Sequence, residues 1–353
     1  MESPSQTDPK VFYVCVTGYG PFSHYARNPA WLSTAPLNGK VLRKFEARLD
    51  TQSIDPVPST GQSLLSEIHI VSFELTVSYQ HVLSVIEPLH ATPPELPDSV
   101  ALPDSLPPQH RPFDLILHVG VGPAGGMRIE AMARRFGYRE PDIDNELAPP
   151  VHPSHLSVQP PPLTMPMTTT RPLRPYVGII PKPIAMLRFR DDVSPPRGFG
   201  QGYEGCPDEI WNPSIDVQQL VQDVHQCGIQ DITHSSDAGL YLCEFVYYCS
   251  LAQHHRIGRR VTSHAAFPIS ATETEASSTA NGQDQEVSSS ASRQEELPPG
   301  VLGTPDRCPK VLFVHVPPVG EPQTLEDMTF AIENIIKVIC WGAGDAAGVR
   351  VDE

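Results

Sequence analysis

The stretch SIDVQQLVQDVHQCGIQDIT, residues 214–233, contains one complete helix followed by one strand. Its apolar residues recur at the three- and four-residue spacing of a helix face, and they are Val217, Leu220, Val221 and Val224. Gly228 ends this pattern, as glycine commonly does after the last turn of a helix. We interpret the segment Ile229–Thr233 that follows as the next strand.

The same alternation of strand and helix extends along the chain in both directions. Further strands are expected at Val11–Val16, Ile68–Val71, Phe113–His118 and Val311–Val316. Helices are expected from a cap at Asn28, over Val77–Ile86, and after a capping box formed by Thr324 and Asp327. Strands that alternate with helices predict an α/β fold with a largely parallel sheet.

The composition indicates a single domain that carries long insertions. Proline accounts for 40 of the 353 residues, which is about twice ordinary usage. We interpret residues 41–66, 91–112 and 146–176 as loops, and residues 264–308, which are rich in Ser, Thr, Glu and Gln, as disordered. About 230 residues remain in the domain, which we place at residues 8–345, and these suffice for one core.

Charge and cysteine content argue against several classes of partner. The net charge of −16 disfavours nucleic acid and anionic membranes, because both attract basic surfaces. No signal peptide is recognised at the N-terminus, and no apolar run approaches the length of a membrane span. The seven cysteines lack metal-type CxxC pairs, so we expect reduced thiols in a cytoplasmic protein.

Three residues that are far apart in the sequence form one possible catalytic set. Cys243 follows a small-residue turn and begins the apolar segment Phe245–Cys249, and a thiol at the start of a helix is favoured as a thiolate. His315 and Glu130 each lie in a short apolar segment that reads as a strand. Together they would supply a nucleophile, its base and a residue that orients the base. Taken singly, each is more often structural: a buried thiol, a core histidine and a salt-bridged carboxylate.

Two other patterns do not indicate a cofactor. Gly120, Gly122 and Gly125 have the spacing of a dinucleotide-binding loop, but no helix with a ribose-binding acid follows at the expected distance. His254 and His255 are adjacent and are followed by Arg256, and histidines in such a setting are more often solvated than metal-bound. We therefore expect no cofactor and no metal.

Four segments, in the same order, resemble the motifs of the pyroglutamyl peptidase I family, whose members are cysteine exopeptidases that remove an N-terminal pyroglutamate. Val16–Phe22, VTGYGPF, is similar to the opening motif of this family, and His118–Glu130 is similar to the second. Asp237–Cys243, DAGLYLC, resembles the nucleophile motif, and Phe313–Pro318, FVHVPP, resembles the histidine motif.

This resemblance implies a three-layer α/β/α sandwich and a peptide substrate that begins with pyroglutamate. It makes Cys243 the nucleophile, His315 the general base and acid, and Glu130 the residue that orients His315. It implies that an apolar slot for the lactam ring is formed by Tyr19, Phe22, Tyr241 and Leu242. It also makes Arg139 a candidate for binding the oxyanion.

Two alternatives remain beside this interpretation, and the oligomeric state is left open. One is a catalytically weak or inactive member of the same family that binds blocked peptides or protein partners, although the presence of Cys243, His315 and Glu130 weighs against it. The other is a phosphorylase-type α/β enzyme, which would need a basic phosphate-binding cluster that the sequence does not display.

Overall fold

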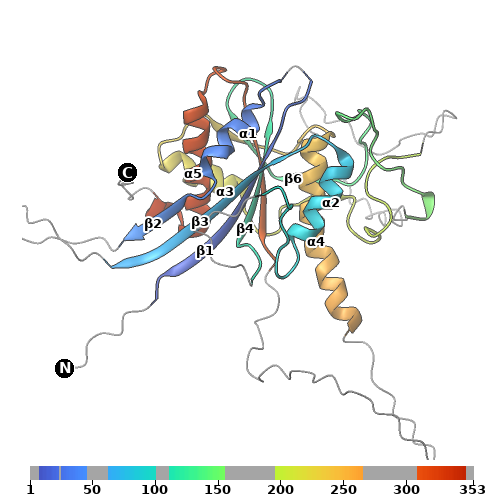
Figure 1. The fold of residues 1–353 in the computed structure, drawn as a ribbon, viewed down its shortest axis with the longest axis horizontal. Helices are drawn as coiled ribbons and strands as arrows, with labels where there is room; N and C mark the ends of the chain where they lie inside the picture. Colours follow the sequence, from blue (N-terminus) through green and yellow to red (C-terminus); the bar gives the residue numbers. More distant parts are fainter. Residues whose placement is uncertain are drawn as a thin grey trace, which may run out of the picture.

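The computed structural model describes residues 8–23, 25–45, 63–100, 111–155, 195–264 and 308–346. In this part of the chain a seven-stranded sheet lies between two layers of helices (Figure 1). In sheet order its strands are β2 (Val41–Phe45), β3 (Leu64–Leu75), β1 (Lys10–Tyr19), β4 (Leu115–Val121), β9 (Lys310–Val316), β5 (Met127–Glu130) and β8 (Ile232–Ser235). Strands β3, β1, β4 and β9 are parallel neighbours, as are β5 and β8, whereas β2 pairs antiparallel with β3 and β5 with β9. The mostly parallel α/β/α sandwich is therefore confirmed.

The helices divide between the two faces of the sheet (Figure 1). One face carries α1 (Pro29–Thr34), α3 (Val217–Gln226) and α5 (Leu325–Trp341), and the other carries α2 (Tyr79–Leu89) and α4 (Leu242–His264). The short elements are α6 (Ala343–Ala346), the 3-10 turns Ala35–Leu37 and Pro153–His155, and a separate pair of strands, β6 (Met132–Arg134) and β7 (Glu209–Trp211). None of the described helices is long and apolar enough to cross a membrane.

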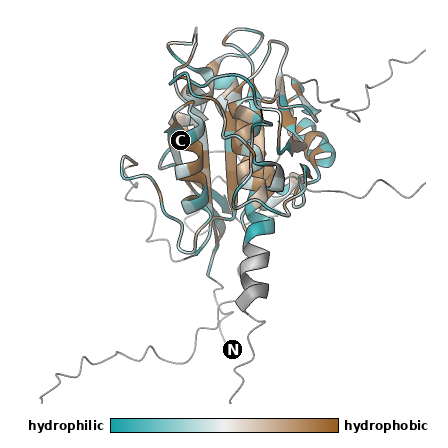
Figure 2. Cartoon of the chain, turned by 90° about the vertical axis from the view of Figure 1, so that its right-hand side faces the viewer, coloured by the Kyte–Doolittle hydropathy of each residue, from teal (hydrophilic) through white to brown (hydrophobic). Residues whose placement is uncertain are grey.

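The central strands are apolar on both sides because helices cover both of their faces. In β4, six successive residues from Leu115 to Gly120 are buried, and in β9 the same holds from Val311 to Val316. Figure 2 shows hydrophobic residues concentrated in these strands and on the helix surfaces that face them. This continuous core holds the ends of β4, β9 and the neighbouring β5 in fixed positions.

The caps expected at Asn28 and Thr324 are confirmed, whereas α2 and α3 begin two and three residues later than expected. The Asn28 side chain accepts a hydrogen bond from the Ala30 backbone at 3.0 Å and caps α1. Thr324 and Asp327 form a reciprocal capping box at the start of α5. Asp216 caps α3 by accepting a bond from Gln219.

One expected loop is wrong in part. Residues 41–66 contain β2 and the first residues of β3. The strand β2 lies at the edge of the sheet, and only Leu42 of its five residues is buried, so it lacks the continuous apolar run that marks the central strands. The predicted disorder over 264–308 falls on residues 265–307, which lie outside the described residues, as do residues 156–176 of another expected loop.

Candidate active site

The register between β5 and β9 brings Glu130 and His315 together. Glu130 is paired with Phe313 and Arg128 with His315, and alternate residues of a strand point to the same face of the sheet. Both side chains therefore lie on the face covered by α4, where His315 Nδ1 is 2.8 Å from Glu130 Oε1. Both residues are buried, with exposed fractions of 7% and 1%. The second carboxylate oxygen of Glu130 has no hydrogen-bond partner among the described residues, so His315 is the partner of this carboxylate there.

The Cys243 thiol completes this group from the third element. Cys243 is the second residue of α4 and is half-buried, and its thiol lies beside His315, where it raises the pKa of the imidazole. Burial lowers the pKa of His315, but Cys243 and then Glu130 raise it more, to about 9. A histidine whose pKa is raised in this way can form an imidazolium beside the thiol, and a neighbouring cation favours a thiolate. The structure thus brings together the three residues that the sequence singled out.

Gly120 in β4 and Gly122, which directly follows the strand, make room for these side chains. A Cβ atom placed on Gly120 would lie 2.8 Å from Cys243 Sγ, and one placed on Gly122 would lie 2.9 Å from His315 Cβ. Both distances are shorter than any ordinary contact, so neither position accepts a side chain without displacement of the site. This gives a physical reason for the glycine pair, which sequence reasoning only excluded as a dinucleotide loop. The available signal was the spacing of two positions between the glycines, because extended backbone places such residues on one face.

The expected slot residues gather around the start of α4. Tyr19, at the end of β1, is buried and donates its hydroxyl to the Leu242 carbonyl at 2.6 Å. The rings of Phe22 and Tyr241 are half-buried, with centroids 6.4 Å apart. Tyr79 of α2 packs edge-on against Tyr241 and was not anticipated from the sequence. We call the rings of Tyr19, Phe22, Tyr79 and Tyr241, which gather near the start of α4, the aromatic wall.

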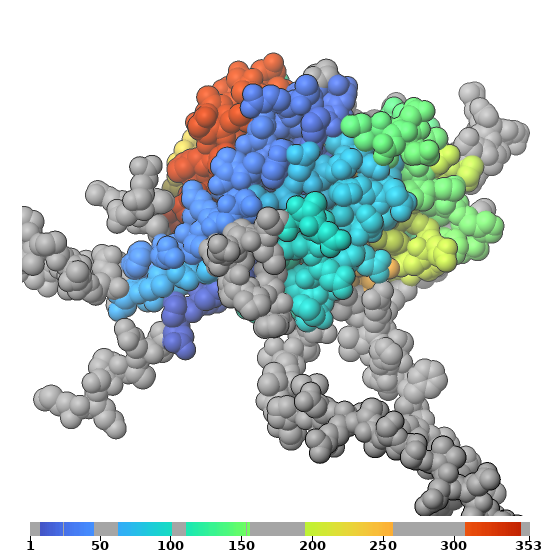
Figure 3. All heavy atoms as spheres, viewed as in Figure 1, coloured from blue at the N-terminus to red at the C-terminus, as the bar shows by residue number. Residues whose placement is uncertain are grey.

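The loop after β6 packs against these aromatic residues. It lies against α2, as Figure 3 shows in green and cyan, because Asp142 accepts a hydrogen bond from the Tyr79 backbone at 2.9 Å. The Tyr241 hydroxyl donates to the Pro141 carbonyl in the same loop at 3.0 Å. Arg139 also belongs to this loop but is exposed, and within the described residues no hydrogen bond or ion pair joins it to Cys243 or His315.

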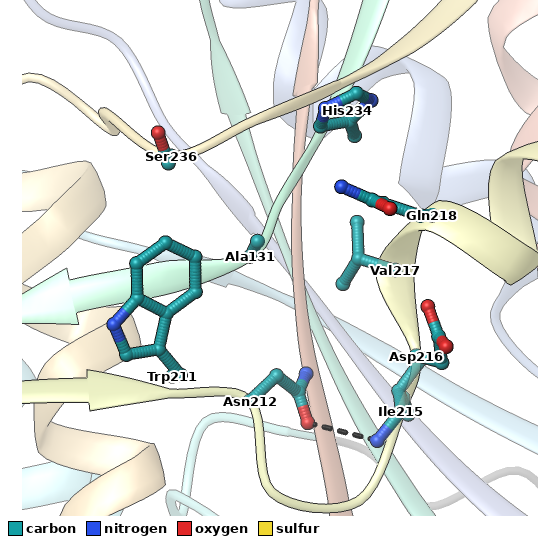
Figure 4. A pocket seen from close by; sticks show the side chains of 9 residues that line it. All are labelled: Ala131, Trp211, Asn212, Ile215, Asp216, Val217, Gln218, His234 and Ser236. Atoms are coloured by element: carbon teal, nitrogen blue, oxygen red, sulfur yellow. Dashed lines mark hydrogen bonds between the residues drawn. The ribbon is translucent and has the colours of Figure 1, made fainter. Parts of the chain in front are cut away.

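A cavity lies apart from these side chains. It has a volume of about 340 Å³ and is lined by Ala131, Trp211, Asn212, Ile215, Asp216, Val217, Gln218, His234 and Ser236 (Figure 4). Asn212 and Ile215 are joined across its rim by a hydrogen bond of 3.0 Å. Although Ala131 follows Glu130 in the chain, none of the three candidate catalytic residues lines this cavity.

Comparison with known proteins gave similarity to solved structures only. No family model matches the chain, and no curated protein matches it. The chain is similar to pyroglutamyl peptidase I from Bacillus amyloliquefaciens, with 15% identity over 96% of this chain and 100% of that chain and a TM-score of 0.46. It is similar to pyrrolidone carboxyl peptidase from Thermococcus litoralis, with 14% identity over 97% of this chain and 100% of that chain and a TM-score of 0.46. It is also similar to the pyrrolidone carboxyl peptidase from Pyrococcus furiosus, with 16% identity over 94% and 100% of the two chains and a TM-score of 0.44. These solved structures carry the name of the family whose motifs the sequence resembles.

Proposed function

We propose that this chain is a cysteine peptidase of the pyroglutamyl peptidase I family, which removes an N-terminal pyroglutamyl residue from peptides. The observation that carries the proposal is the position of His315, whose Nδ1 is 2.8 Å from the buried Glu130 carboxylate and whose pKa is raised by the neighbouring Cys243 thiol. The four sequence motifs support the substrate class. A cytoplasmic location is part of the same proposal.

In the first half of the reaction, the Cys243 thiolate attacks the pyroglutamyl carbonyl carbon and a C–S bond forms. The carbonyl oxygen becomes an oxyanion at the start of α4. Phe245 makes the first backbone hydrogen bond of this helix, to Tyr241 at 2.9 Å, so the Cys243 N–H precedes the helical ladder and is free to donate. Because Arg139 is exposed, we assign the oxyanion to backbone N–H groups rather than to this side chain.

His315 then moves the protons that the reaction requires. Its imidazolium donates a proton to the leaving amine as the C–N bond breaks, which leaves an acyl-thioester. Neutral His315 next accepts a proton from water, whose oxygen attacks the thioester and releases pyroglutamate and the thiol. Glu130 stabilises the imidazolium and fixes the orientation of the ring throughout, and it forms no bond to the substrate.

The aromatic wall supplies a reason for selecting a blocked terminus. Phe22 and Tyr241, which are half-buried, offer ring surfaces that suit an uncharged lactam, and we propose that Tyr19 supports them from the end of β1. An ordinary amino terminus is charged, and burying it without a partner would cost several kcal/mol. Peptides with a free terminus would therefore bind poorly.

The test is hydrolysis of a pyroglutamyl aminocoumarin amide by the full chain and its variants. We expect Cys243→Ala and His315→Ala to abolish turnover and Glu130→Gln to retain a residual rate, because an orienting carboxylate makes no covalent bond. Cys340→Ala is the matched control: Cys340 is also half-buried, but burial raises its pKa to about 12, so it should be inert. Binding of a pyroglutamyl peptide with no turnover by the unmodified chain would favour the non-catalytic alternative.

A further inference from the structure

Glu244 directly follows the candidate nucleophile and is buried with an exposed fraction of 0%. Carboxylates are rarely buried so completely unless partners satisfy both oxygens. Here Oε1 accepts from the Arg134 backbone N–H at 2.9 Å and from its Nε at 2.6 Å, while Oε2 accepts from Arg134 Nη2 at 2.7 Å and from the Leu240 backbone N–H at 2.8 Å. All of the hydrogen-bonding capacity of this carboxylate is directed at two residues.

These contacts join three segments at the place where the chain turns into α4. Arg134 belongs to β6, Leu240 to the turn, and Glu244 to the first turn of the helix. The guanidinium of Arg134 also contacts Asp237, at the beginning of the same turn. A single arginine therefore spans the turn from its first residues to the helix that follows it.

The turn needs such support because its backbone is strained. Leu240 has a φ of +49°, in the left-handed region that residues other than glycine seldom adopt. Backbone of this kind persists where the surrounding contacts hold it in place. Glu244 accepts a hydrogen bond from the N–H of Leu240, which lies three residues before Cys243.

We propose that Glu244 and Arg134 form a positioning pair that fixes the turn and first helical residues on which the Cys243 thiol is carried. The proposal rests on the function proposed above, because it assigns the pair a role in the reactivity of that thiol. Neither side chain contacts the reacting atoms. Their effect reaches the reaction through the backbone on either side of Cys243.

The experiment compares Glu244→Gln with a matched control, Glu333→Gln. Glu333 of α5 is buried to a similar degree and is also paired with two cations, Lys337 at 2.6 Å and Lys40 at 2.5 Å, but it lies in the helical layer on the other face of the sheet. Both variants should lose stability. We would measure site-resolved alkylation of Cys243 by iodoacetamide and turnover of the pyroglutamyl amide, at a temperature where both proteins are folded.

We expect Glu244→Gln to slow alkylation and to lower kcat by about tenfold to 10²-fold, the range that misplacement of a reacting group produces, with a smaller change in KM. The sign of the alkylation change is informative. Removing a negative charge beside a thiolate would by itself favour the thiolate and speed alkylation, so slower alkylation identifies a loss of position. The Glu333→Gln control should alkylate and turn over at wild-type rates.

Arg134→Lys provides a second variant that keeps the charge and disturbs the fold less. An ammonium cannot bridge both oxygens of Glu244 and reach Asp237 at once, so we expect an intermediate loss of alkylation rate and kcat. If the folded fractions of Glu244→Gln and Arg134→Lys both react at wild-type rates, as for Glu333→Gln, the pair is only structural and the proposal is overturned. Alkylation is measured without peptide, so a chain that fails to hydrolyse the amide would refute the peptidase function and still leave this test decisive.

Discussion

A methyl group added at Gly120 tests directly where the thiol of the candidate site lies. An ideal Cβ at this position would be 2.8 Å from Cys243 Sγ and 2.8 Å from the Phe313 ring. Relaxed contacts between heavy atoms lie at about 3.5–4.0 Å, so the thiol or the ring must move by about 1 Å. Because a displacement of about 1 Å at a reacting group can cost about 10²-fold in rate, we expect kcat/KM of Gly120→Ala to fall by about 10- to 10²-fold. Overpacking of this kind also lowers the free energy of unfolding by about 1–3 kcal/mol.

The assay is release of aminocoumarin from the pyroglutamyl amide, with thermal unfolding measured on the same samples. Gly200→Ala is the control, since a Cβ there would meet Val151 at an ordinary 3.5 Å and should leave rate and stability unchanged. Gly122→Ala should resemble Gly120→Ala, because its Cβ would press on His315 at 2.9 Å. A Gly120→Ala protein with wild-type kcat/KM and wild-type stability would show that the thiol does not occupy the position described.

Three further predictions concern pH and the insertions. Because the pKa of His315 is raised to about 9, the imidazolium that protonates the leaving amine is lost above that pH, so the kcat profile should fall near pH 9, and in Glu130→Gln it should fall at lower pH. Burial lowers the pKa of His118 to about 3 and that of His90 well below its usual range, so both are neutral when folded. The stability that they contribute is present above the unfolded pKa of about 6.5 and is lost as pH falls below it, at up to about 1.4 kcal/mol per pH unit for each histidine. Urea unfolding at pH 7 and pH 5 measures this loss of stability. The loss should be smaller in His118→Gln. Deletion of residues 268–304 should leave thermal stability and turnover nearly unchanged, because so few apolar residues cannot offset the entropy of ordering the segment, and a loss of more than about 2 kcal/mol would contradict this.

The fold could be predicted where local pattern and burial agree. The central strands are continuous apolar runs, and the ends of α1 and α5 carry side chains that cap helices wherever they occur. The edge strand β2 could not be predicted, because an edge strand needs only one buried residue and gains its structure from pairing with β3. The reversed direction of β5 and β8 was also beyond local pattern, since strand direction is set by long-range pairing.

The candidate catalytic residues could be predicted from motifs, but the residues that hold them in place could not. Gly120 and Cys243 are 123 positions apart, and their close approach follows from the pairing of β4 with β9 and the docking of α4. The same holds for Glu244, whose partner Arg134 lies 110 positions away. In the sequence, a glutamate after an apolar turn reads as an ordinary helix residue, and only its complete burial distinguishes it.

The start of α4 carries two acidic groups in succession, the Cys243 thiol and the Glu244 carboxylate. A helix N-terminus favours anions, and any two negative charges held close together repel each other unless cations lie beside them. Here the cations come from different strands, His315 from β9 and Arg134 from β6. They differ in one property that matters: an arginine stays protonated at any working pH, whereas a histidine can give up its proton and take it back. Under the proposed function, the start of α4 would hold a permanent ion pair suited to fixing the backbone and, one residue earlier, a thiol beside a histidine that can move a proton. Exchanging the two cations would then keep the charge balance but leave the reaction without an acid.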